Sequence, residues 1–409
     1  MITTSLSKPL FSKHLMRTTL GAMALALLAG CASKGEPAFT PKELRSFDET
    51  SSLDSVWGRR VGDGFGPARY PIAPSREGDT VFAADTNGLV AAFNANSGER
   101  EWEVELDTPI SSALNAIAGQ VYLGTRNGEV IALDQRDGSV AWRSRVTSEV
   151  LAAPQANQQL LLVQSVDGQI TALDRASGEE RWVYTSSQPA LTLRGTGTPM
   201  VIDPVTFVGT ANGRLATLDN RSGQPLWEMQ IATPRGRSDV ERLVDLSGQP
   251  VLSPDGLLFV TSYNGRVVAL EATRGGVLWE TNLSSRHTPI LVGDFLFVVS
   301  DDSHIVALDA NSGQEIWRND DLEDRWLTAP AFADGRIVVG DFEGYVHLID
   351  AREGNLVGRT RIDDSGISVR PVTEGRMVLP SVTGRTLIPE SSIRVRPTRL
   401  PSRASMRWT

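Results

Sequence analysis

The chain has 409 residues, 40% of them hydrophobic, and its 40 lysines and arginines against 49 aspartates and glutamates give a formal charge of -9. This length and apolar content suit a globular protein with a sizeable core. The apolar residues are not collected into runs of roughly 20, as transmembrane helices require, and the acidic balance disfavours general nucleic-acid binding. Polytopic membrane proteins and nucleic-acid binders are therefore excluded.

Residues 1–30 predict a secretory signal peptide. They contain three basic residues and no acidic one, followed by an apolar run from Leu20 to Gly30 that is too short to span a bilayer. The segment Leu28-Ala29-Gly30-Cys31 ends at the only cysteine and resembles a bacterial lipobox. In that resemblance Cys31 is lipidated and begins the mature protein. The alternative is a lone unpaired thiol after an ordinary cleavage site.

Residue 32 bears on where such a lipoprotein would go. Ala32 follows the cysteine, in place of the aspartate that tends to retain lipoproteins in the inner membrane. We therefore expect outer-membrane sorting on the periplasmic side, with residues 31–52 as the lipidated N-terminus and linker.

A repeat of about 40 residues fills most of the mature chain. Each unit combines a turn, an apolar segment of strand type, an acidic residue or asparagine, and a second glycine turn. The short acidic or amide side chain is expected to cap the second turn and not to act in catalysis. The first turns fall at Gly88, Gly128, Gly168, Gly213, Gly265, Ser303, Gly344 and Gly384.

A tryptophan closes most units, 14 residues after the first turn position. We expect these tryptophans to pack between neighbouring units as core residues, and not to form a ligand platform. One further tryptophan precedes the first unit, whereas the seventh unit has Gly358 at this position. The structural tryptophans are Trp57, Trp102, Trp142, Trp182, Trp227, Trp279 and Trp317.

The repeat predicts an all-β fold, an eight-bladed β-propeller of four-stranded antiparallel blades over residues 53–393. The eighth unit stops before its outer strand. The segment from about Leu53 is expected to supply that strand and close the ring, which removes an exposed edge. Residues 394–409 form a basic tail, expected to be disordered; the alternative is electrostatic attachment to anionic lipid or to an acidic partner.

The sequence shows no carriers of catalysis, and no cofactor-binding or metal-binding residue is expected. Only His287, His304 and His347 follow Cys31, and no two share the i, i+4 spacing of a helical metal pair. We expect them at the surface or on blade faces. The repeat around Ala172 to Trp182 resembles the tryptophan-docking motif of quinoprotein propellers, but this chain lacks the adjacent cysteines of those dehydrogenases. A quinoprotein-like or other ligand-binding propeller stays open as the alternative.

Two connections between successive units are longer than the others. Trp182 and Pro199 are 17 residues apart, and Trp227 and Pro250 are 23 apart, whereas Trp142 and Pro154 are 12 apart. Because both long loops belong to successive units, they are expected to lie side by side on one rim. They provide the ingredients of a partner site, unless the first loop folds its leucines back onto the blades.

The lipobox, the repeats and the motifs Leu191-Thr-Leu193-Arg194-Gly and Arg-Leu-Val-Asp245 together resemble the BamB family, the propeller lipoproteins of the β-barrel assembly machinery. The resemblance implies that Leu191, Leu193, Arg194 and Asp245 contact the periplasmic POTRA domains of BamA. The family often has a second aspartate where this chain has Ser247. It also implies a non-enzymatic outer-membrane scaffold, linked through BamA to the other Bam subunits, that assists insertion of outer-membrane β-barrel proteins.

The residues themselves do not decide how such a scaffold acts. The loop face is suited to orienting POTRA domains, and strand edges are suited to direct pairing with nascent outer-membrane proteins. An unrelated envelope scaffold is the remaining interpretation.

Overall fold

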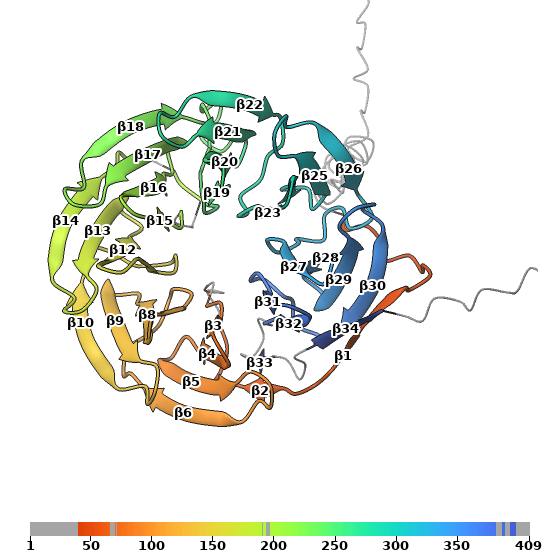
Figure 1. Cartoon of the computed structure of the whole chain (residues 1–409), viewed down its shortest axis with the longest axis horizontal. Helices are drawn as coiled ribbons and strands as arrows, with labels where there is room; N and C mark the ends of the chain where they lie inside the picture. The colour runs from red at the N-terminus through yellow and green to blue at the C-terminus, as the bar shows by residue number, and fades with distance from the viewer. Residues whose placement is uncertain are drawn as a thin grey trace, which may run out of the picture. The chain divides into compact units, whose positions relative to one another are not determined.

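The computed structural model describes residues 40–65, 70, 72–189, 191–193, 197–381, 387–388 and 393–397. The expected signal peptide, Cys31, Arg194, the turn at Gly384 and residues 398–409 lie outside the described residues. The backbone from Lys42 onward forms one compact unit, and its strands are arranged as a ring of sheets around a central axis (Figure 1).

Seven sheets each consist of four consecutive antiparallel strands. Within each sheet the first strand lies innermost and the fourth lies at the outer wall (Figure 1). In chain order the strands are β3 (Ser75–Glu77), β4 (Thr80–Ala84), β5 (Leu89–Asn94) and β6 (Arg100–Glu105); β7 (Asn115–Ile117), β8 (Gln120–Gly124), β9 (Glu129–Asp134) and β10 (Val140–Arg145); β11 (Gln155–Ala156), β12 (Leu160–Gln164), β13 (Gln169–Asp174) and β14 (Glu180–Thr185); β15 (Met200–Val201), β16 (Val205–Gly209), β17 (Arg214–Asp219) and β18 (Pro225–Gln230); β19 (Val251–Leu252), β20 (Leu257–Thr261), β21 (Val267–Glu271) and β22 (Val277–Thr281); β23 (Ile290–Val292), β24 (Phe295–Val299), β25 (Ile305–Asp309) and β26 (Glu315–Asn319); β27 (Ala331–Ala333), β28 (Arg336–Gly340), β29 (Tyr345–Asp350) and β30 (Leu356–Arg361).

The prediction of an all-β propeller is confirmed, but the prediction of eight blades is corrected. The repeat builds seven regular blades, and the last unit does not form another of the same kind. In its place, β31 (Val372–Glu374) and β32 (Met377–Leu379) combine with β34 (Ile393–Pro397) and the N-terminal strand β1 (Ser51–Asp54) in a composite sheet.

The segment expected to follow the turn at Gly384 is divided. Its described residues form β33 (Leu387–Ile388), which pairs with β2 (Arg59–Arg60) in a two-stranded sheet. The third position of the composite sheet is taken by β34, which pairs with β32 and β1 and includes the first residues of the segment expected as a tail. The unit therefore cannot fold from consecutive strands, because its outer strand comes from the other end of the chain.

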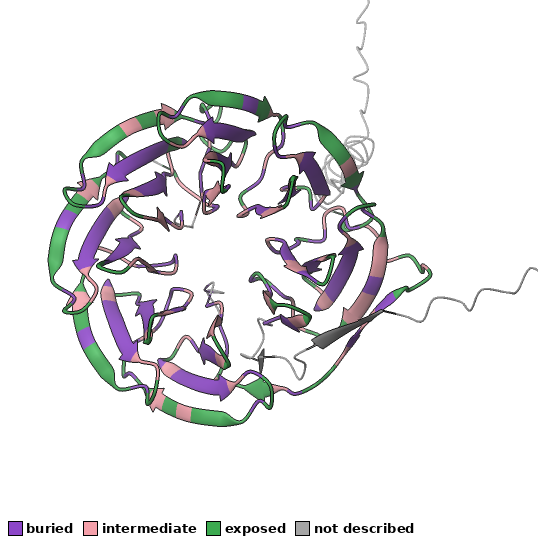
Figure 2. Ribbon diagram, in the orientation of Figure 1, coloured by how far each residue is buried: buried purple, intermediate pink, exposed green. Residues whose placement is uncertain are grey.

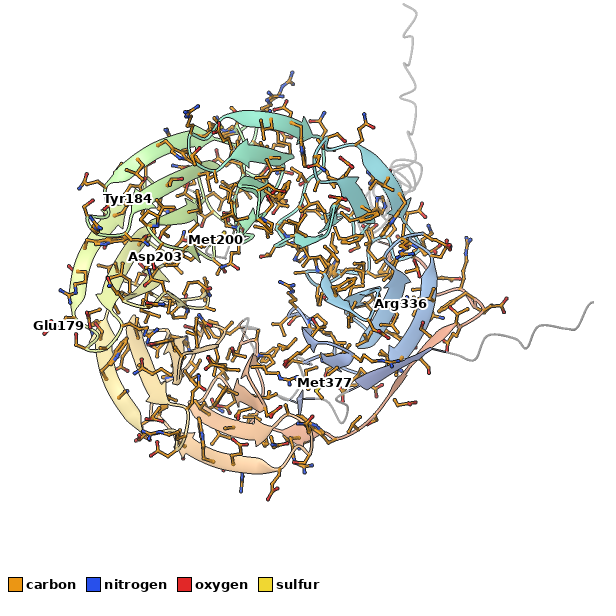
Figure 3. The ribbon with its side chains drawn as sticks, in the orientation of Figure 1. Glu179, Tyr184, Met200, Asp203, Arg336 and Met377 are labelled. Atoms are coloured by element: carbon orange, nitrogen blue, oxygen red, sulfur yellow. The ribbon has the colours of Figure 1, made fainter. Side chains whose placement is uncertain are left out.

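Burial follows strand position within each blade. The second and third strands are sandwiched between neighbouring blades and are almost fully buried, as in β12 and β13. Outer strands such as β14 are mostly exposed, and Trp182 is the buried residue of that strand (Figure 2). Two-sided burial explains the near-continuous apolar runs of the repeat. Met200 lies toward the inner side of its blade, and Glu179 lies at the outer rim (Figure 3).

A tryptophan from the preceding part of the chain docks onto each of the seven regular blades. The Trp142 ring covers Gly178 in the next blade so closely that a Cβ added there would lie 2.6 Å from the ring. Its Nε1 also donates a hydrogen bond to the carbonyl oxygen of Arg175, at 3.0 Å. The same arrangement joins Trp57 to Ala95 and Gly98, with an Nε1–O distance of 2.9 Å.

The remaining predicted tryptophans are placed in the same way. Trp227 covers Gly275, although its buried Nε1 has no hydrogen-bond partner among the described residues. Trp102, Trp182, Trp279 and Trp317 donate to the carbonyl oxygens of Gln135, Asn220, Ala310 and Ala351.

The seventh regular blade lacks the tryptophan because the N-terminal segment occupies its space. A Cβ added to Gly358 would lie 2.4 Å from the carbonyl oxygen of Ser51. The preceding residue, Thr50, donates its backbone N–H to the carbonyl oxygen of Val357, at 2.9 Å. Only glycine at this position lets β1 approach so closely.

Most of the acidic residues before the second turn cap that turn, as predicted, whereas the Glu271 side chain accepts a hydrogen bond from Thr273 Oγ1 at 2.9 Å. Asp174 accepts backbone hydrogen bonds from Ala176 and Ser177 at 3.0 and 2.9 Å. A side-chain hydrogen bond from Arg181, together with these backbone bonds, lowers the pKa of Asp174 to about 2. The corresponding Glu390 lies outside the described residues.

We predict that Trp142→Ala destabilises the ring, because it removes a buried ring and a hydrogen bond at a blade junction. The expected loss is about 3–5 kcal/mol in the free energy of unfolding, measured by urea denaturation. Trp142→Phe, the matched control, retains an aromatic ring and should lose less. An alanine variant with an unchanged urea midpoint would contradict the docking role.

Candidate partner-binding face

The two long loops share one end of the ring. In an antiparallel four-stranded blade, the connection from the fourth strand to the next blade lies at the same end as the turn between the second and third strands. Residues 186–199 connect β14 to β15, and residues 231–250 connect β18 to β19. The loops are in contact, since Cβ atoms added to Gly197 and Gly209 would lie 2.7 and 2.5 Å from the carbonyl oxygen of Leu246. Their predicted adjacency is therefore observed.

The described part of the first loop presents a leucine to solvent. Leu191 is 44% exposed, and Leu193 is half-buried. Leu191 is thus not folded back onto the blades, which was the competing expectation. Arg194 lies outside the described residues, so its position relative to the leucines stays a prediction.

The second loop adds an exposed apolar residue that sequence reasoning missed. Val240 is 65% exposed and is flanked by charged side chains. The only signal was one valine within the charged run from Arg235 to Arg242. Glu241 accepts hydrogen bonds from the backbone N–H groups of Arg237 and Ser238, and these bonds lower the pKa of its carboxyl. The loop therefore has local structure that supports Val240.

Asp245 is buried, although the sequence suggested a charge presented to a partner. It is 1% exposed, and its backbone carbonyl accepts a hydrogen bond from Tyr263 N–H at 2.9 Å. Burial raises the pKa of Asp245 to about 6, against opposing hydrogen bonds from Ser247 and the Leu246 backbone. In the free chain, its carboxylate is therefore covered.

Asp245 lines a small cavity beneath the first loop, together with Gln164, Gln188 and Thr192. Asp245 Oδ2 and Gln164 Oε1 are buried acceptors for which no described residue is a hydrogen-bond partner. Gln164 Nε2 donates to the carbonyl oxygen of Gly209 at 3.0 Å. In the sequence, the indication of this cavity was Gln164, an amide residue at the end of β12. The equivalent strands of the neighbouring blades end at Gly124 and Gly209.

The histidines do not form a metal site in the part of the chain that the structure describes. No group of three or more His, Cys, Asp or Glu residues there is placed to hold a metal ion. Of the two expected positions, surface or blade face, His347 has the second, since it lies on β29; it is fully buried there, 3.0 Å from Asp341, Nε2 to Oδ2. No helix among the described residues is long and apolar enough to cross a membrane.

The ring belongs to the class of β-propellers built from tryptophan-docked repeats. Among solved structures, BamB from Moraxella catarrhalis aligns with a TM-score of 0.74 at 24% identity, covering 84% of this chain and 98% of that one. A europium-containing methanol dehydrogenase aligns with a TM-score of 0.69 at 14% identity, covering 81% of this chain and 85% of that one. At these identities the likenesses show the fold alone.

Sequence comparison identifies the family. The family model described as outer membrane protein assembly factor BamB matches residues 43–123, 86–319 and 301–389. A Pseudomonas aeruginosa relative of that name is 46% identical, covering 87% of this chain and 93% of its own length. The Escherichia coli relative is 31% identical, covering 88% and 95%. The chain belongs to the BamB family.

We predict that Asp245→Asn changes how stability depends on pH. Because the folded-state pKa is raised from 3.8 to about 6, the carboxyl stabilises the fold fully below pH 3.8, and this contribution is lost as pH rises through 6. Between pH 4 and 7 the wild type should lose about 2–3 kcal/mol relative to the variant. Urea unfolding across this range measures the difference. A difference independent of pH would contradict the assigned burial of the charge.

Proposed function

We propose that the chain is a non-enzymatic scaffold of the outer-membrane β-barrel assembly machinery and binds the POTRA region of BamA. Membership of the BamB family supports the assembly role. The single observation that favours the loop face is the exposure of Leu191 and Val240 on adjacent loops of a rigid ring. Exposed apolar residues rimmed by charges are typical of partner sites.

The proposed contact has an exposed and a covered part. Leu191, Leu193 and Val240 provide apolar anchors, and Arg194 provides an orienting charge. Asp245 lies beneath the loop, so we propose that it contributes after Thr192 and Gln188 move or after a partner side chain enters the cavity. A positively charged donor would complement the unpaired acceptors of Asp245 and Gln164.

Lipidation at Cys31 is proposed as the attachment to the periplasmic face of the outer membrane. It rests on the lipobox, which lies outside the described residues. A chain with a lipid at one end and a binding face on its ring would hold its partner close to the membrane. Such a role requires no catalytic residue. Through BamA, the scaffold would reach the other Bam subunits and nascent outer-membrane proteins.

We predict that Leu191→Ser weakens binding of the purified chain, Ala32 to Thr409, to the BamA POTRA region about tenfold or more. Arg194→Glu should weaken it further, because it reverses a charge at the same loop. Calorimetric titration measures the dissociation constants, and circular dichroism checks folding.

Leu278→Ser is the matched control, since Leu278 is 57% exposed on β22 at the outer wall, outside both loops. It should bind like the wild type. Equal binding by all four proteins would exclude the loop face, and no binding by the wild type would contradict the proposed partner.

A further inference from the structure

Two aromatic side chains lie exposed together at the loop end of another blade. Trp326 belongs to the connection between β26 and β27, and Phe342 belongs to the turn between β28 and β29. They are 52% and 36% exposed, with ring centroids 6.2 Å apart. This pair, the Trp326–Phe342 patch, lies farther along the ring than the two long loops, where blade β23–β26 meets blade β27–β30 (Figure 1).

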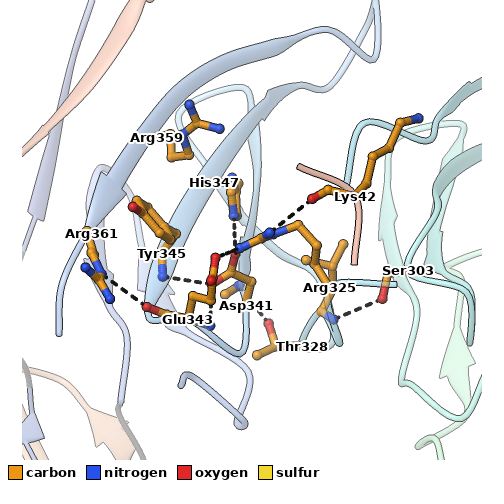
Figure 4. Close-up of polar contacts among 12 residues, drawn as sticks. Lys42, Ser303, Arg325, Thr328, Asp341, Glu343, Tyr345, His347, Arg359 and Arg361 are labelled. Atoms are coloured by element: carbon orange, nitrogen blue, oxygen red, sulfur yellow. Dashed lines mark hydrogen bonds and ion pairs between the residues drawn. The ribbon is translucent and has the colours of Figure 1, made fainter. Parts of the chain in front are cut away.

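Arg325, the residue before Trp326, supports the patch from beneath. Arg325 is 3% exposed, forms an ion pair with Asp341 at 2.7 Å and another with Glu343, and lies over the Phe342 ring at 5.2 Å (Figure 4). Trp326 itself has a φ of 49°, in the left-handed region that non-glycine residues rarely adopt. A buried charge network thus stabilises a strained backbone that keeps a tryptophan at the surface.

The N-terminal segment joins the ring directly beside this patch. Lys42 donates its backbone N–H to the carbonyl oxygen of Glu323 at 3.0 Å, and its own carbonyl oxygen accepts from Arg325 Nη1 at 3.1 Å (Figure 4). Its Nζ lies 3.3 Å from Asp320. Three contacts fix Lys42 next to the residue that precedes Trp326.

Few residues separate Lys42 from Cys31, the expected site of lipidation. Eleven residue steps separate Lys42 from Cys31, and a fully extended chain of that length spans at most about 40 Å. The attachment point beside the Trp326–Phe342 patch therefore lies no farther than this from the surface that holds the acyl chains, which allows the patch to reach that surface.

We propose that the Trp326–Phe342 patch is a second membrane contact, inserted at the interface of the bilayer to which Cys31 is attached. This inference rests on the lipid anchoring in the proposed function. Tryptophan favours the headgroup region of bilayers, and the tether makes the second contact intramolecular, so a weak interaction suffices. The contact holds the edge of the ring near Trp326 at the membrane, whereas the two long loops belong to other blades.

The charges around the patch select the kind of lipid. Asp302, Glu323 and Asp324 lie on the segments that flank Trp326, and Asp324 N–H donates to the Asp302 carbonyl at 2.9 Å. Because carboxylates are repelled by an anionic surface, we assign the patch to a zwitterionic bilayer surface.

Iodide quenching of the lipidated full-length protein tests the contact on phosphatidylcholine–phosphatidylethanolamine vesicles. Protein without acyl chains, in solution without detergent, gives the reference value of quenching. The difference in quenched fluorescence between the wild type and Trp326→Phe isolates the signal of Trp326. We expect that difference to disappear on vesicles, because the bilayer shields Trp326. With the neutral quencher acrylamide in place of iodide, replacing half of the lipid with phosphatidylglycerol should restore quenching, because the carboxylates near Trp326 are repelled by the anionic surface.

Two variants accompany the measurement. Phe342→Ser should partly restore iodide access to Trp326 on vesicles, whereas Leu278→Ser, which changes an exposed residue of the outer wall, should leave protection intact. Vesicle-bound protein whose Trp326 is quenched as in solution would overturn this inference alone. Lipidated protein that does not associate with vesicles would overturn the proposed anchoring and this inference together.

Discussion

The docking of a tryptophan onto a glycine turn of the next blade is the interaction on which the ring depends. Each docked indole fills the space above a residue without a side chain, as Trp142 does over Gly178. A hydrogen bond from Nε1 to a backbone carbonyl then fixes its position in most junctions. Since six of the seven regular blades both contribute and receive such a contact, displacement of one of them would disturb two interfaces.

The same constraint explains how the two ends of the chain are used. Trp57 docks onto the first regular blade, and β1, just before it, completes the composite sheet. The approach of β1 to Gly358 replaces the tryptophan that the seventh regular blade lacks. With its blade interfaces fixed, the ring can carry long loops at one end without changing its core, which separates the residues available for binding from those that maintain the fold.

The sequence predicted the regular part of this structure well because each blade is local: one unit of about 40 residues contains its strands, its capping aspartate and its docking tryptophan. The composite sheet was not predictable in the same way, since it joins strands from both ends of the chain. Burial of Asp245 depends on packing of the second loop against Gly197 and Gly209. The exposure of Trp326 likewise depends on the ion pair between Arg325 and Asp341, which belong to different strand connections. No local sequence pattern predicts this ion pair.

We propose that the loop end of the ring, and not its opposite end, faces BamA. Site-specific photocrosslinking in intact cells tests this directly, with the photoreactive residue placed at Val240 in the second long loop or at Glu179 in the turn between β13 and β14, which lies at the other end of the ring. We predict crosslinks to the BamA POTRA region from position 240 and none from position 179. Crosslinks to BamA from position 179 alone would contradict it.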